Sequence, residues 1–66
     1  NWNYIQGGIQ ITAPAALLTL YDLTGSVVKA VQVKNQADIH IVNPGIYVMK
    51  VQSSNGETSI EKILVK

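Results

Sequence analysis

The sequence has no cysteine, no arginine and only one histidine. Because cysteine is missing, no disulfide can stabilise the fold, and a single histidine cannot complete a closed zinc site. Arginine supplies the bidentate contacts that proteins commonly make with phosphates and guanine bases. Here five lysines face four acidic residues, and the formal net charge is only +1. We therefore expect this chain to bind no metal, no cofactor and no nucleic acid.

Long apolar runs are also missing. The longest covers Ala13–Leu18 and is interrupted by Pro14, whereas a membrane-spanning helix needs about 20 predominantly apolar residues. We therefore expect no membrane span, and no signal peptide is visible. Asn1 does not resemble a native start. We expect the 66 residues to be one piece of a longer protein.

The chain is short and rich in apolar residues. It is 47% hydrophobic and 14% charged, and a chain of this length buries only about 60% of the surface that its unfolded form exposes. Ordering the chain costs roughly 1.5 kcal/mol per residue. One compact domain over residues 1–66 is therefore the limit, and nearly every apolar side chain is needed in its core.

Valine and isoleucine dominate the apolar residues, which favours β-strands. Turn-forming residues, such as those in Asn43-Pro44-Gly45, divide the chain into seven short pieces, none of which is long enough for a convincing helix. This spacing is typical of an all-β, immunoglobulin-like sandwich of about seven mostly antiparallel strands. The predicted strands are Asn3–Gln6, Ile9–Thr12, Ala16–Asp22, Val27–Lys34, Ala37–Val42, Ile46–Ser53 and Thr58–Lys66.

Period-two alternation predicts which side chains face the core. The alternating sets are Ile9/Ile11, Leu18/Leu20, Ile39/Ile41 and Tyr47/Met49/Val51. Two strands break the pattern, the one that begins at Val27 and the one that ends at Lys66. Each of these strands is expected to contain a bulge or to be covered on both faces.

Two short segments predict hairpin loops. Asp22–Gly25 and Ser54–Glu57 each contain a glycine, which readily adopts the positive φ that closes such a turn. Pro44 has no N–H to donate, so Asn43-Pro44-Gly45 is expected to be a turn that leads into the strand beginning at Ile46.

No set of residues predicts catalysis. His40 lies between two apolar residues of a predicted strand and has no partner for a triad or a metal site, so we expect a surface histidine. The four carboxylates are single, and a domain this small can hardly enclose the cleft that a glycosidase pair requires. The serines lack a nucleophile-elbow context. We predict that the domain is not an enzyme.

Three blocks occur in order along the chain. They are Leu20-Tyr21-Asp22-Leu23-Thr24-Gly25, then Pro44-Gly45-Ile46-Tyr47-Val48-Met49-Lys50-Val51, and finally Glu61-Lys62-Ile63-Leu64-Val65-Lys66 after Gly56-Glu57. Together they resemble the C-terminal sorting domains of the type IX secretion system, such as those on gingipain-type proteases. The resemblance covers about Ala16 to Lys66, and its specificity lies in the combination of the three blocks.

The resemblance implies a fold and a role. The fold is a seven-stranded immunoglobulin-like sandwich at the C-terminus of a cargo protein, and the partner is the outer-membrane translocon. The cargo would pass through the periplasm to the cell surface or the medium. A sortase-like protease commonly removes such domains and joins the cargo to surface lipopolysaccharide. The matching positions make Gly45, Tyr47, Val48, Lys50, Lys62, Val65 and Lys66 the candidates for translocon recognition.

Two further possibilities stay open. An accessory adhesion or carbohydrate-binding module of a secreted hydrolase would use exposed aromatic rings, and Trp2 and Tyr4 are the candidates because an N-terminal strand can fray. Open strand edges in a domain without disulfides also predict a homodimer, formed by exchange of the N-terminal strand or by edge pairing.

Overall fold

The structure is a computed structural model that describes residues 1–66 as five β-strands without a helix. Every strand pair is antiparallel. The structure contains no helix that is long and apolar enough to cross a membrane. The strands are β1 (Trp2–Ile5), β2 (Gly8–Tyr21), β3 (Val27–His40), β4 (Gly45–Ser53) and β5 (Thr58–Val65).

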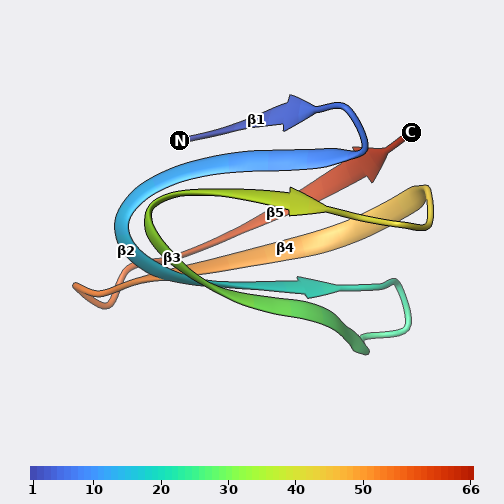
Figure 1. Ribbon diagram of the computed structural model, residues 1–66. Coiled ribbons are helices and arrows are strands. Elements are labelled where there is room, and N and C mark those ends of the chain that lie inside the picture. Colours follow the sequence, from blue (N-terminus) through green and yellow to red (C-terminus); the bar gives the residue numbers. More distant parts are fainter.

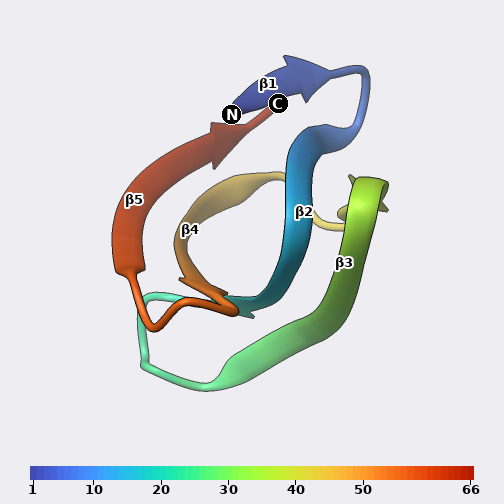
Figure 2. The same ribbon diagram turned by 90° about the vertical axis from the view of Figure 1, so that its left-hand side faces the viewer.

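β2 organises the sheet, because three of the other strands pair with it. β3 follows one edge of β2 along its length. β1 and β4 share the opposite edge, where β1 pairs with Gly8–Ile11 and β4 with Ala16–Tyr21. β5 continues the sheet beyond β4. Since β2 and β3 both bend, the sheet curls round on itself, and β1 comes to lie near the end of β5 (Figures 1 and 2).

The prediction of an all-β antiparallel fold is confirmed, but the division into seven strands is wrong. The expected breaks at Ala13-Pro14-Ala15 and Asn35-Gln36 lie inside β2 and β3. Ala13 pairs with Asn35 and the next pair is Ala16 with Val33, so two residues of β2 oppose one of β3. Such a bulge bends a strand pair without ending it. The immunoglobulin-like sandwich stays a prediction.

Side chains on the concave side of the curl form one core of twelve buried residues. Most of the predicted alternating sets belong to it, whereas Val51 is only half-buried. The predicted irregularity at the start of β3 is confirmed: Leu20 pairs with Lys29 and Tyr21 with Val27, which leaves Val28 as a bulge. The same prediction is wrong for β5, whose register with β4 is unbroken. The core residues are Ile9, Ile11, Ala16, Leu18, Leu20, Val33, Ile39, Ile41, Tyr47, Met49, Ile63 and Val65.

Both predicted hairpin loops are present. In the β2–β3 loop, Oδ1 of Asp22 accepts hydrogen bonds from the backbone N–H of Thr24 at 2.9 Å and of Ser26 at 3.1 Å. The Thr24 hydroxyl donates to the same oxygen at 2.5 Å. In the β4–β5 loop, Oδ1 of Asn55 accepts from the backbone N–H of Glu57 at 3.1 Å. Short polar side chains thus replace the missing ladder bonds at both loops.

Candidate functional site

Six of the seven candidate recognition residues lie on the β4–β5 hairpin, and Lys66 follows it directly. The register runs without a shift from the pair Gly45–Val65 to the pair Gln52–Thr58. Because side chains of a strand alternate between its two faces, the candidates divide into an inward and an outward set. The inward side chains can only stabilise the hairpin, whereas the outward side chains can contact a partner.

The inward set consists of Tyr47 and Val65, which belong to the core with only 8% and 3% of their surface exposed. Tyr47 pairs with Ile63, and its hydroxyl donates to the backbone carbonyl of Asn43 at 2.5 Å. Gly45, the pair of Val65, is half-buried with a φ of 153°. These residues shape the hairpin and attach the preceding loop to it, and neither Tyr47 nor Val65 is open to a partner.

The outward set consists of Val48, Lys50 and Lys62. Val48 pairs directly with Lys62, and both lysines and the valine occupy the convex side of the hairpin. Sequence reasoning missed their apolar neighbours on the same side: Ile46 is 42% exposed, Leu64 48% and Ile60 65%. Continuing the pairing through the Ser54–Glu57 loop would have found them. We call this surface the outer face of β4–β5, and it comprises Ile46, Val48, Lys50, Ile60, Lys62 and Leu64.

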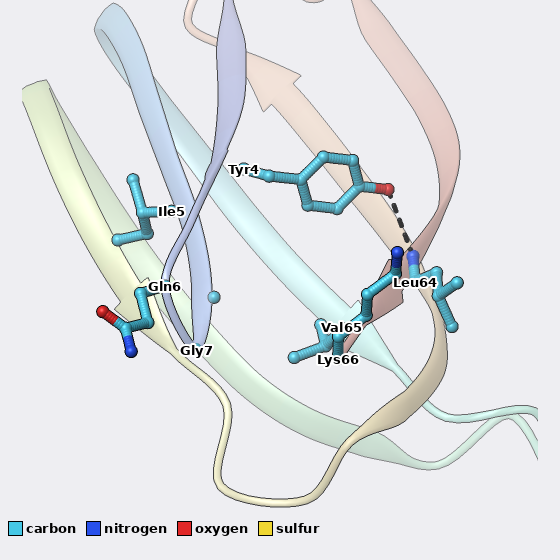
Figure 3. Close-up of a pocket in the computed structure, with 8 residues that line it drawn as sticks. Tyr4, Ile5, Gln6, Gly7, Leu64, Val65 and Lys66 are labelled. Carbon is cyan, nitrogen blue, oxygen red and sulfur yellow. Dashed lines mark hydrogen bonds between the residues drawn. The ribbon is translucent and has the colours of Figure 1, made fainter.

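A hollow of about 530 Å³ lies next to this face, between β1 and the end of β5. Lys66 is exposed at its rim (Figure 3). The ring of Tyr4 reaches across the hollow from β1, and its hydroxyl accepts a hydrogen bond from the backbone N–H of Leu64 at 3.2 Å. Residues Tyr4, Ile5, Gln6, Gly7, Gly8, Leu64, Val65 and Lys66 line the hollow.

The far edge of β5 has no strand beside it, because β4 is its only partner. The backbone N–H of Leu64 points away from β4, since it bonds to Tyr4. In an antiparallel strand the backbone groups of alternate residues point to the same side. Ile60 and Lys62 therefore also direct their N–H and C=O groups to the free edge. This edge and the outer face of β4–β5 together form the candidate recognition site.

The remaining candidates have a simpler place in the structure. His40 is exposed, as expected. No group of three histidine, aspartate or glutamate side chains is arranged to hold a metal ion. The rings of Trp2 and Tyr4 lie 5.0 Å apart at an interplanar angle of 82°. They meet edge to face, so they do not form one flat surface on which a sugar could stack.

Comparison with known proteins identifies the family. The sequence model of the secretion system C-terminal sorting domain matches residues 4–66. The match begins at Tyr4, whereas the resemblance recognised in the sequence begins at about Ala16. It includes every candidate recognition residue. No curated protein and no solved structure gave a significant match.

The family match indicates the role of the domain. It supports a sorting signal for type IX secretion, which implies interaction with the type IX machinery and delivery to the cell surface or the extracellular space. It gives no support to an adhesion or carbohydrate-binding module. The matched residues include the whole of β2 to β5 and the end of β1. This chain belongs to the family of secretion system C-terminal sorting domains.

Proposed function

We propose that this domain is a non-catalytic export signal, read by the type IX outer-membrane translocon at the free edge of β5 and the outer face of β4–β5. The observation that carries the proposal is the free edge itself, which lies beside exposed apolar and lysine side chains. An extended receptor segment can add to such an edge, because backbone hydrogen bonds provide affinity and the alternate side chains provide specificity.

The separation of the candidate residues supports a division of labour. Tyr47 and Val65 are buried, so they act by holding the hairpin in shape. Val48, Lys50 and Lys62 lie on the outer face, where a receptor can touch them. Lys66 is exposed just beyond the last strand and contributes a further charge. The recognised object is therefore the folded hairpin rather than a linear motif.

Several finer steps belong to the same proposal. The domain would be the C-terminal part of a longer cargo protein, which crosses the periplasm before it meets the translocon. A sortase-like protease then removes the domain and joins the cargo to the cell surface. We also retain the proposal that the curled sheet is a form of the immunoglobulin-like sandwich. These steps rest on the family to which the chain belongs.

Secretion of a reporter tests the proposal. The domain is appended to a periplasmic reporter protein in a bacterium with an active type IX system, and the reporter is measured in the medium and at the cell surface. Lys62→Glu should lower secretion several-fold, because it reverses a charge on the recognised face. Lys34→Glu is the matched control, since Lys34 is exposed on β3, away from the hairpin.

The outcomes separate the steps. A wild-type fusion that stays in the periplasm would overturn the export function. Secretion by Lys62→Glu at the level of Lys34→Glu would overturn the role of the outer face. The mass of the secreted reporter tests processing, because a product that retains all 66 residues contradicts removal of the domain.

A further inference from the structure

Tyr4 connects the two ends of the chain. It lies on β1, 60 residues before its hydrogen-bond partner Leu64 on β5. The ring packs edge to face on Trp2, which is half-buried against the core, and 54% of Tyr4 remains exposed. Figure 3 shows the ring lying across the hollow with its hydroxyl directed at the Leu64 nitrogen.

This hydrogen bond occupies the free edge of β5 at its last backbone donor. The N–H of Leu64 is one of the groups that an added strand would have to bond with its own carbonyl. A hydroxyl oxygen from the side chain of Tyr4 now takes the place of that carbonyl. A single N–H makes one well-aligned bond, so Tyr4 and an added strand compete for the same donor.

We propose that Tyr4 is a displaceable latch on the recognised edge: its hydroxyl caps Leu64, and a receptor strand that adds to β5 must displace it and enter the hollow between β1 and β5. The inference rests on the proposed function, because the occupant is an extended segment of the translocon.

The size and place of the hollow fit this occupant. Its volume of about 530 Å³ extends along both β1 and the end of β5. β1 and β5 run in the same general direction, as Figure 1 shows, so a segment between them can lie antiparallel to both. The lining is partly apolar, with Ile5, Leu64 and Val65 among its residues.

Opening the latch does not require unfolding. The four residue pairs of β1 with β2 and the contact of Trp2 with the core do not involve the Tyr4 hydroxyl, so its departure from Leu64 breaks neither. The bond is exposed, and a net contribution of one such bond corresponds to a factor of about two to ten in an equilibrium constant. The latch therefore weakens capture by a factor of that order without preventing it.

Hydrogen exchange of the 66-residue domain tests the cap independently of secretion. Tyr4→Phe removes the hydroxyl and retains the ring, so the Leu64 amide should exchange about five-fold faster. Tyr21→Phe is the matched control, because the half-buried Tyr21 hydroxyl makes no hydrogen bond to Leu64 and lies on β2. Exchange at Ile63, whose amide faces β4, reports general destabilisation. Equal acceleration at Leu64 and Ile63, or none at Leu64, overturns the cap.

The reporter fusion tests the competition. Tyr4→Phe should raise the initial secretion rate about two-fold or more at equal expression, and Tyr21→Phe should leave it unchanged. A Tyr4→Phe rate equal to or below that of a secreted wild-type fusion overturns the latch. Failure of the wild-type fusion to leave the periplasm instead overturns the proposed function, and with it the competition, while the exchange result still decides whether Tyr4 caps Leu64.

Discussion

Gly8 is a point of close approach between β2 and β3. It pairs with His40, and a Cβ at this position would overlap the backbone carbonyl oxygen of Ile39 and lie 2.9 Å from its carbon. Both atoms belong to the backbone of β3 where it pairs with β2, so a rotamer change cannot relieve the overlap. The absence of a side chain at Gly8 is thus a requirement of the fold.

Gly8→Ala should therefore destabilise the domain by about 2 kcal/mol or more, since it forces a backbone shift in a packed region. Gly7→Ala is the control on the neighbouring turn. Gly7 has a φ of 77° and open space around its Cβ position, so the alanine should cost only about 1 kcal/mol from backbone strain. Urea unfolding of both variants measures the difference. Equal losses would contradict the close-approach argument.

Asp22 is the second residue whose chemistry is fixed by a turn. The Thr24 hydroxyl is the main cause that holds the pKa of Asp22 below its ordinary value of 3.8, and backbone N–H donors of the same loop add to the effect. These donors stabilise the ionised carboxylate of the folded state. Because the pKa is lower when the chain is folded, Asp22 stabilises the fold above pH 3.8, and this contribution disappears as the pH falls through the folded-state pKa.

The melting temperature should therefore fall as the pH is lowered from neutral into the acid range, in part because Asp22 becomes protonated. Asp22→Asn, which has no proton to bind in this range, should lose less of its melting temperature on acidification than the wild type. Thr24→Val removes the largest single donor and should give an intermediate slope. An Asp22→Asn variant with the same acid slope as the wild type would refute the assignment.

At the scale of the strand, β2 combines a position that tolerates proline with positions that do not. Pro14 lies in the bulge between Ala13 and Ala16, where the pairing with β3 is interrupted. Thr19 lies in the part of β2 that is paired on both sides, with Ala30 of β3 and Lys50 of β4. A proline has no N–H to donate to a ladder, so the sheet accepts it only where no partner needs that donor.

Thr19→Pro should therefore destabilise the domain by about 2 kcal/mol or more, because it leaves a carbonyl of a neighbouring strand without its donor. Pro14→Ala is the control and should change the free energy of unfolding by less than about 1 kcal/mol. Circular dichroism followed during urea unfolding measures both. A Thr19→Pro variant as stable as Pro14→Ala would contradict the requirement for a backbone donor at Thr19.

The same strand explains what the sequence could and could not predict. The alternation of Leu18 and Leu20 and of Tyr47 and Met49 depends only on period two, and it placed these side chains in the core correctly. Proline in Ala13-Pro14-Ala15 signals a local interruption, but whether the chain turns or bulges depends on the partner strand. β3 continues past that point with Asn35 at a φ of 68°, so the interruption became a bend.

The candidate site was predictable to a similar degree. The family resemblance located the β4–β5 hairpin, and its register then separated buried Tyr47 and Val65 from outward Lys62. The contact between Tyr4 and Leu64 was not predictable, since it joins residues 60 positions apart through the curl of the whole sheet. No local pattern in the sequence contains that information.

At the scale of the whole molecule, the curled sheet ends in strands with free edges. β3 pairs only with β2, so its 14 residues present a long unpaired edge. One of its outward groups, the backbone carbonyl of His40, accepts a hydrogen bond from Nζ of Lys29 at 3.1 Å. A charged side chain on an edge discourages pairing with other chains. The rest of the β3 edge has no such cap.

Edge pairing through β3 therefore predicts a weak homodimer, whereas exchange of β1 requires loss of its pairs with β2. Light scattering from micromolar to millimolar concentration should show the mass rise from one chain towards two. The backbone N–H of Ile41 donates to Gly7 of the β1–β2 turn, on the β2 side of the strand. Because backbone groups alternate between the two sides, the amides of Asp38 and His40 point to the free edge. Hydrogen exchange at these two amides should therefore slow at high protein concentration. Protection confined to β1 would favour strand exchange. A constant monomer mass would contradict both routes and would mean that Lys29 and the bends in β3 suffice to keep the edge unpaired.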